Sequence, residues 1–234
     1  MKIDFDQKIA QSYDKWYETD FGKYTASAQN ELMINLLKPF PGQRLLDIGC
    51  GTGTHLKLFG ELGLDTVGLE LSIFMLKKAK EKQKDKLELI LAKGEEIPIK
   101  DNAFDFTILF TTLEFSQNPI EVLKEAGRVT KKKIFIGVLN SWSLLAIRRR
   151  VRGWFKPSIY NKAEFYNICK LKKILKISLI FNSLAWGGVG SLPSGRAFRT
   201  SPFLNTKLFR WLDKRFFCGK NPFASFLGAL IELQ

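Results

Sequence analysis

Glycines and acidic residues near position 50 carry the clearest chemical signal in the chain. Residues 47–53, DIGCGTG, follow a short apolar run and precede apolar residues at helical spacing. This pattern predicts a glycine-rich turn between a strand and a helix. Residues without a Cβ let a ligand approach the backbone and tolerate unusual dihedral angles. Taken alone, the turn fits either a packing element or a nicotinamide dinucleotide site.

An acidic residue further along the chain narrows these alternatives. Glu70 ends the next apolar run, 21 residues after Gly49. At that distance a carboxylate can accept hydrogen bonds from both hydroxyls of an adenosyl ribose. The spacing GxGxG also has a shorter last gap than the GxGxxG of dinucleotide sites. We therefore interpret the turn as part of a site for an adenosyl cofactor.

Strand and helix patterns alternate around this turn. Apolar runs predict strands, and apolar residues at helical spacing predict helices. The expected strands are residues 44–48, 65–70, 87–92, 104–110 and 133–139. The expected helices are residues 25–38, 56–62, 72–86 and 119–130. Such alternation is typical of a parallel sheet covered by helices on both faces.

The last 94 residues differ from the rest of the chain in charge. Residues 141–234 contain 17 Lys and Arg against 3 Asp and Glu, whereas residues 1–140 contain 20 of each kind. The whole excess of +14 therefore lies in this part and indicates an anionic partner. Here we expect basic helices, strands and a loop rich in Gly, Pro and Ser. The helices are 141–156, 162–176 and 203–217, the strands 177–186 and 226–233, and the loop 187–202.

Four motifs in order resemble those of class I S-adenosylmethionine-dependent methyltransferases of the type 11 group, which includes ubiquinone and menaquinone biosynthesis enzymes. They are LLDIGCGTGTH, VGLELSIFMLKKAK, GEEIPIKDNAFD and FDFTILFTTLEF. The resemblance covers residues 40–140, and the YDKWY segment more loosely. It implies an α/β, Rossmann-like, doubly wound and mostly parallel seven-stranded sheet in one domain, residues 1–234. Within it we expect a helical flap (1–40), a cofactor-binding core (41–140) and a basic cap with closing strands (141–234).

The resemblance also assigns residues to the cofactor, S-adenosyl-L-methionine. Asp47 lies near its amino group, the glycine turn under its methionine part, and Glu70 at the ribose. The family often has an acidic residue for the adenine where this chain has Lys93. The implied cofactor-binding residues are Asp47, Gly49, Cys50, Gly51, Thr52, Gly53, Glu70, Leu71, Gly94, Glu95, Phe110 and Thr111.

Catalysis of methyl transfer depends mainly on holding the nucleophile in line with the methyl carbon. A general base helps only where the acceptor is a hydroxyl or a protonated amine. Glu114 in TTLEF is the first candidate base, followed by Tyr13 and Tyr17 in the flap. Alternatively, Glu114 is a surface residue and the tyrosines pack in the core. We expect no metal site, because the cysteines are scattered and the single histidine, His55, is expected on a helix surface.

The acceptor is expected to be a small or lipid-like molecule. Residues 141–156 and 203–217 place apolar side chains on one helical stripe and basic ones on much of the rest. They fit a substrate-binding cap or a helix lying on an anionic membrane. The alternatives are an RNA methyltransferase, which lacks support from any RNA-binding module, and a non-catalytic membrane-associated protein that keeps the fold. Without a signal peptide or an apolar run of about 18 residues, we expect a cytoplasmic protein, at most peripheral to a membrane.

Overall fold

A seven-stranded sheet organises the part of the chain that the computed structural model describes, residues 5–83, 87–156, 158–190 and 219–234. The strand order is β3-β2-β1-β4-β5-β7-β6. Strands β1 to β5 are parallel to one another, and β7 pairs antiparallel with both β5 and β6. The strands are β1 Arg44–Ile48, β2 Asp65–Glu70, β3 Glu88–Leu91, β4 Phe104–Phe110, β5 Thr130–Leu139, β6 Phe181–Val189 and β7 Phe226–Leu233. The expected α/β, mostly parallel, Rossmann-like sheet is confirmed.

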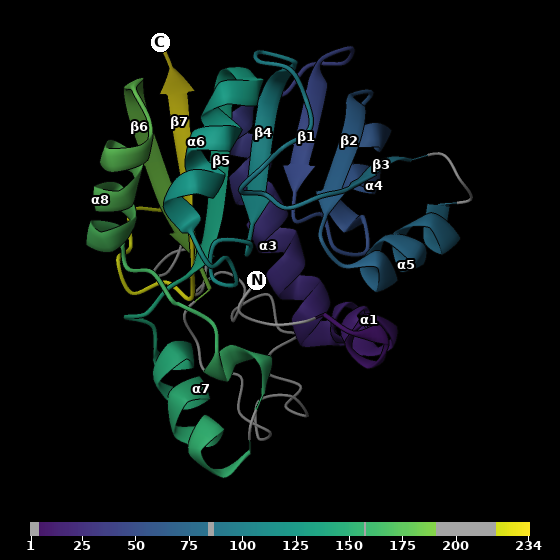
Figure 1. Ribbon diagram of the computed structural model, residues 1–234. Helices are drawn as coiled ribbons and strands as arrows, with labels where there is room; N and C mark the ends of the chain where they lie inside the picture. The colour runs from purple at the N-terminus through teal and green to yellow at the C-terminus, as the bar shows by residue number, and fades with distance from the viewer. Residues whose placement is uncertain (1–4, 84–86, 157, 191–218) are drawn as a thin grey trace.

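Helices cover both faces of this sheet (Figure 1). On one face, α3 (Asp20–Leu37) buries Met33 and Leu37 against β1, β4 and β5. On the other, α6 (Pro119–Val129) and α8 (Ile168–Ser178) pack on the strands through side chains such as Leu123 and Leu171, both fully buried. Helices α4 (Thr54–Glu61) and α5 (Ile73–Gln83) pack beside β2 and β3. The central strands are therefore covered on both faces, as their continuous apolar runs require.

Three further helical segments lie beyond the carboxyl ends of the parallel strands. They are α1 (Gln7–Tyr13), α2 (Lys15–Glu18) and α7 (Leu144–Phe155). Figure 1 shows α1 and α7 below the edge at which β1 ends. Side chains set where these helices begin: Asp6 accepts from the Ile9 amide at 2.8 Å and Ser143 from the Ala146 amide at 3.1 Å. The carboxyl ends of the parallel strands thus face a layer built by the N-terminal flap and the basic cap.

Some sequence-based boundaries are confirmed and others are shifted. The strand expected at 133–139 begins at Thr130, and the helix expected at 25–38 begins at Asp20. The strands 44–48, 65–70 and 104–110 begin and end as expected. The helix expected at 162–176 begins only at Ile168, because Tyr166 is drawn into a bridge with Asn140 and its amide donates to the Leu139 carbonyl. The strand expected at 177–186 is Phe181–Val189, since α8 continues to Ser178. The loop expected at 187–202 was wrong at its start, because residues 187–189 belong to β6.

Two expectations concern residues that the structure leaves undescribed. The remainder of the loop, from residue 191, and the third basic helix, 203–217, lie outside the described residues.

The strand expected at 226–233 is β7, which lies between β5 and β6 instead of at the edge of the sheet.

Candidate cofactor and acceptor site

The site lies where the strand order reverses, between the carboxyl ends of β1 and β4. Strand β1 has β2 on one side and β4 on the other, so the segments that follow β1 and β4 depart in opposite directions and leave a crevice. The amides of Gly49 and Cys50 donate to the Leu69 carbonyl at 2.7 and 3.1 Å. Across the crevice, the Thr112 hydroxyl donates to the Ile48 carbonyl at 2.9 Å.

Only glycine fits at the first position of the turn. Gly49 has a φ of 75°, and a Cβ there would lie 2.6 Å from the side chain of Thr112. Both the left-handed backbone and the close approach of the two loops therefore exclude a larger residue. Gly51 has a φ of 55° as well, but only the end of Met75 lies within 4 Å of its Cβ position, at 3.8 Å. The space beside Gly51 is the pocket itself.

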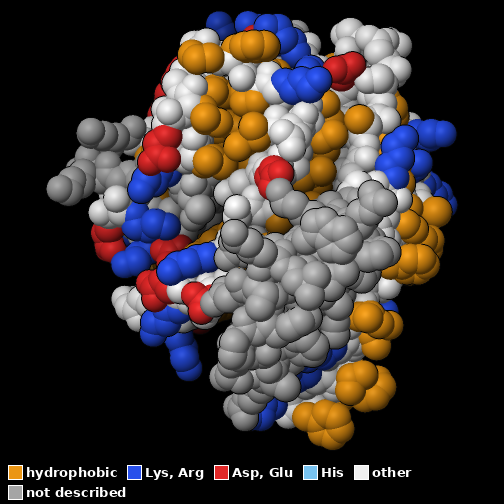
Figure 2. Space-filling model, turned by 180° about the vertical axis from the view of Figure 1, so that it is seen from behind, with side chains coloured by type: hydrophobic (Ala, Val, Ile, Leu, Met, Phe, Trp, Pro, Cys, Tyr) orange, Lys and Arg blue, Asp and Glu red, His pale blue; other side chains and the backbone are white. Residues whose placement is uncertain are grey.

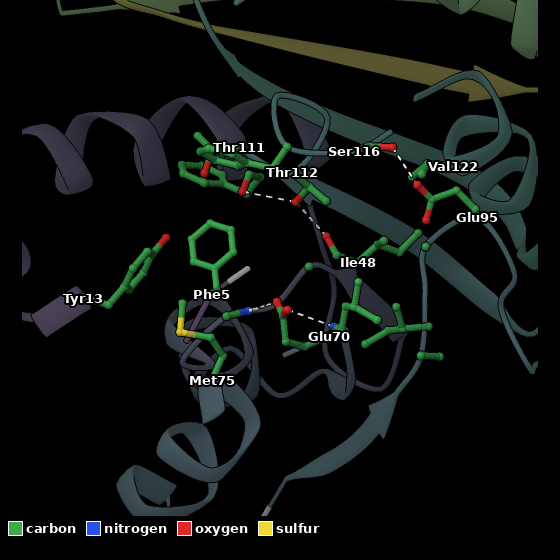
Figure 3. A pocket seen from close by; sticks show the side chains of 18 residues that line it. Phe5, Tyr13, Ile48, Glu70, Met75, Glu95, Thr111, Thr112, Ser116 and Val122 are labelled. Carbon is green, nitrogen blue, oxygen red and sulfur yellow. Dashed lines mark hydrogen bonds between the residues drawn. The ribbon is translucent and has the colours of Figure 1, made fainter. Parts of the chain in front are cut away.

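The carboxylate of Glu70 links the glycine turn to the turn that follows β2. Its Oε2 accepts from the Gly51 amide at 3.1 Å, and its Oε1 accepts from the Leu71 amide at 2.9 Å (Figure 3). Oε1 also accepts from the Ser72 amide at 2.8 Å. Burial raises the pKa of Glu70, while these three hydrogen bonds lower it. A hydrogen-bonded carboxylate at the rim of the pocket also keeps lone pairs for a ligand hydroxyl.

Asp47 has no hydrogen-bond partner in the part of the chain that the structure describes. Its side chain is fully buried, and neither carboxyl oxygen has a hydrogen bond to any described residue. Burial raises the pKa of Asp47 to about 8, and the charge of Glu70 adds to this effect. A buried carboxyl group without partners costs free energy, which a ligand that brings hydrogen-bond donors would recover. The glycine cradle and this carboxyl group together fit a cofactor that carries an ammonium group.

A pocket lies above these residues, at the ends of β1, β2 and β4. Its walls bring together residues from the glycine turn, from the ends of β2 and β4, and from the flap (Figure 3). Eight of the expected cofactor residues line it: Gly49, Gly51, Glu70, Leu71, Gly94, Glu95, Phe110 and Thr111.

Four expected cofactor residues do not line this pocket. Asp47 lies in β1, just before the turn, and Gly53 is the N-cap residue of α4, just after it. Cys50 packs against Leu56 in a buried cluster. The hydroxyl of Thr52 donates to Asp14 Oδ1 at 2.7 Å. In this turn, alternate residues face the pocket, and the others attach it to the flap and to the neighbouring helix.

Nine further wall residues were not among the expected cofactor-binding residues. They are Phe5, Ile48, Leu69, Met75, Ala92, Thr112, Phe115, Ser116 and Val122. The Ser116 hydroxyl, for example, donates to Glu95 Oε1 at 2.9 Å, which joins two loops that are 21 residues apart. A contact between two irregular loops leaves no periodic pattern, so only the folded chain reveals it.

A second cavity continues from the first toward the cap. The two cavities share five lining residues: Phe5, Tyr13, Phe110, Thr111 and Phe115. Both flap tyrosines line the second cavity, as does α7. Burial raises the pKa of Tyr13 well above its ordinary value and that of Tyr17 to about 12. Both phenols therefore keep their protons at neutral pH and act as hydrogen-bond donors.

Glu114 lies apart from both cavities. It is fully buried, so the alternative that it is a surface residue is wrong. Its Oε1 accepts from the Leu139 amide at 2.6 Å, and its other oxygen has no partner among the described residues. Burial raises the pKa of Glu114 to about 8. It is not among the residues that line either cavity, so the structure does not bring it to the cofactor residues.

His55 also differs from its expected place. It was expected on a helix surface but is buried, with its ring 4.2 Å from that of Phe110, centroid to centroid. Burial lowers the pKa of His55 to about 4, so it packs as a neutral ring. The described residues contain no cluster of His, Cys, Asp and Glu that could hold a metal ion. Among these residues there is also no helix with the length and hydropathy needed to span a bilayer.

Comparison with known proteins places this site in context. A family model described as a methyltransferase domain matches residues 46–136. The uncharacterized protein MJ1123 of Methanocaldococcus jannaschii is 34% identical over 171 residues, which are 72% of this chain and 77% of that protein. The demethylmenaquinone methyltransferase of Renibacterium salmoninarum is 36% identical over 100 residues, 43% of this chain and 42% of its own length. The chain thus matches less than half of that enzyme.

Solved structures share the fold. A methyltransferase of Thermotoga maritima, described as dependent on S-adenosylmethionine, superposes with a TM-score of 0.71 at 19% identity, over 97% of both chains. The magnesium protoporphyrin IX methyltransferase of Synechocystis PCC 6803, with bound S-adenosylhomocysteine, superposes with a TM-score of 0.67 at 12% identity, over 98% of this chain and 96% of that one.

Replacing Glu70→Ala should weaken binding of S-adenosylmethionine at least about tenfold, because it removes the carboxylate that orders three amides at the pocket rim. Isothermal titration calorimetry measures this change, and thermal unfolding confirms that the variant folds. Glu88→Ala on β3 is the matched control, since that carboxylate is exposed. Equal affinity in Glu70→Ala and the control would contradict the assignment.

Stability should fall as the pH rises from about 6.5 to about 8. The folded-state pKa values of Asp47 and Glu114, both about 8, exceed the ordinary values of 3.8 and 4.5, so the folded chain binds more protons than the unfolded chain in this range. The lowered pKa of His55 acts in the opposite sense, but only below about pH 6.5. Urea unfolding at several pH values measures the slope. Asp47→Asn and Glu114→Gln should each reduce it, and an unchanged slope in both would rule out this explanation.

Proposed function

Since the chain belongs to the class I S-adenosylmethionine-dependent methyltransferases, we propose that it methylates a small or lipophilic acceptor held in the second cavity. The supporting observation is the shared wall of the two cavities, to which Phe110 and Thr111 at the end of β4 contribute. An acceptor in the second cavity would therefore lie next to a cofactor in the first. Such placement is the main requirement of a displacement at a methyl carbon.

The cofactor supplies, when bound, a methyl group on a positively charged sulfur, and the protein holds the reactants in place. Asp47 and Glu70 provide carboxylates for an ammonium group and for ribose hydroxyls. Thr111 lies at the border of the two cavities with a φ of 53°, fixed by a hydrogen bond of 2.8 Å from its amide to the Gly137 carbonyl. A strained backbone held by the sheet is a common feature of functional sites. The fixed backbone of Thr111 would define the border between the two cavities, where the two reactants would meet.

The flap supplies the exclusion of water that this chemistry requires. The Ser72 hydroxyl donates to the Phe5 carbonyl at 2.5 Å, and the Phe5 ring packs edge-on against Phe115 with centroids 5.3 Å apart. These contacts fasten the flap over the end of the glycine turn. Tyr13, which lines both cavities, is placed to donate its phenolic proton to an acceptor oxygen. Of the three candidate catalytic residues, only Tyr13 lines both cavities, and as a protonated phenol it would act as a hydrogen-bond donor and not as a base.

The nature of the second cavity favours a small acceptor over RNA. Its walls on the flap side are largely aromatic, from Tyr13, Trp16, Tyr17, Phe21 and Tyr24. Aromatic walls of this kind enclose the apolar body of a small ligand. The partial likeness to enzymes named for demethylmenaquinone supports a lipophilic ring compound as well.

Transfer of radiolabelled methyl groups to a cell extract tests this proposal. We expect the label in small molecules that partition into organic solvent, and none when Glu70→Ala replaces the wild-type protein. Glu88→Ala should transfer label at the wild-type rate, because its exposed carboxylate touches no part of the site. Label confined to RNA would contradict the proposed acceptor class, and absence of transfer with any fraction would contradict the activity.

A further inference from the structure

The second cavity has one wall of a different kind, formed by α7. Arg148, Arg149, Arg152 and Lys156 all line it. None of the described lining residues is an Asp or a Glu. The cavity therefore presents four cationic side chains opposite the aromatic side chains of the flap. Cationic groups along a partly enclosed wall raise the local concentration of anions.

The orientation of α7 places these four cations on one side of the helix. The positions of the four cations repeat at helical spacing on the side toward the cavity. Exposed apolar residues lie elsewhere on the helix, with Trp154 (81% exposed) opposite the cations and Phe155 (80% exposed) beside them. Figure 2 shows hydrophobic side chains at the end of the molecule where α7 lies. Arg148 and Arg149 are half-buried, whereas Arg152 and Lys156 are exposed, so the basic side of α7 is partly shielded by the cavity and partly open to solvent.

Neighbouring groups fix one of these cations without neutralising it. The Arg149 guanidinium stacks over the Tyr160 ring at 4.0 Å and lies 5.9 Å from the Phe165 ring. Such stacking orders an arginine while leaving its hydrogen-bond donors available. Arg149 also acts on the buried carboxyl group of Glu114, whose pKa of about 8 keeps it largely protonated at neutral pH. The charge of Arg149 therefore remains effective in the cavity.

We propose that the methyl acceptor is an anionic amphiphile, with an apolar ring-containing body between the flap aromatics and a phosphate or carboxylate group bound by Arg149, Arg152 and their neighbours on α7. This inference rests on the proposed function and adds the charge of the substrate to it. Arginine suits both anions, because its planar donors pair with two oxygens at once. The cap thereby selects the acceptor by charge, while the flap selects it by shape.

Two fluorescent probes that differ in one charged group test this proposal. 8-Anilinonaphthalene-1-sulfonate carries an anion, and N-phenyl-1-naphthylamine has the same ring system without it. The variant Arg149→Gln/Arg152→Gln should weaken binding of the sulfonate probe about tenfold or more and change binding of the neutral probe less than about twofold. Because Arg149 packs on Tyr160, Arg152→Gln/Lys156→Gln provides a second variant, and circular dichroism verifies both folds.

The control Arg150→Gln/Lys162→Gln removes the same net charge from exposed residues that do not line the cavity. It should leave both probes unaffected. Phenyl phosphate and benzoate, used as competitors, separate a preference for phosphate from one for carboxylate. Equal losses in the test and control variants, or equal losses for both probes, would overturn the proposal. So would sedimentation with phosphatidylglycerol vesicles that depends on Arg149 and Arg152 while the probes bind alike, because α7 would then be a membrane contact.

Binding of S-adenosylmethionine to the same variants separates this inference from the proposed function. Calorimetry should give the wild-type affinity, because none of the substituted arginines lines the cofactor pocket. Absence of cofactor binding in the wild-type protein would contradict the proposed function itself. Normal cofactor binding without selectivity for the anionic probe would contradict only the charge assigned to the acceptor.

Discussion

The parallel pairing of β1 with β4 is the constraint on which the site depends. It aligns Ile48 beside Leu109, so that the glycine turn and the segment from Phe110 onward leave the sheet at the same edge. The strand order reverses at this pair, and the two segments therefore diverge and leave a crevice. The hydrogen bonds of Glu70 to the turn and of Thr112 to β1 preserve that crevice. The cofactor pocket follows from sheet topology; Glu70 at the end of β2 lines it, and Asp47 is buried near the end of β1 behind its lining.

Much of this arrangement is legible in the sequence, because strand ends and glycine turns have short-range signatures. Gly49, Gly51 and Glu70 could be placed in the site from spacing and family resemblance, and the structure lines the pocket with all three. Ser116 could not, since it reaches the pocket through a loop whose path depends on tertiary contacts. The start of α8 was misplaced for the same reason: Tyr166 is held extended by its hydrogen bond to Leu139, against the local helical pattern.

The sequence shows where the excess positive charge lies but does not show what it binds. The excess of basic residues after residue 140 indicates an anionic partner in general terms. The fold adds direction, because it places the basic side of α7 against a cavity lined by flap aromatics. The flap and α7, which are more than 100 residues apart in the sequence, thus line one cavity. Phe5 and Tyr13 of the flap line the cofactor pocket as well, whereas α7 lines only the second cavity.

We propose that the carboxyl group of Asp47, which has no partner among the described residues, binds the cofactor's ammonium group. Proton release on binding of S-adenosylmethionine tests it most directly, measured by calorimetry at pH 6.5 in buffers with different ionisation enthalpies. With a pKa of about 8 in the free protein, Asp47 must lose its proton as it pairs with a cation. The account predicts release of about one proton by the wild-type protein and none by Asp47→Asn. Equal release by both proteins, or binding by the wild type without release, would contradict it.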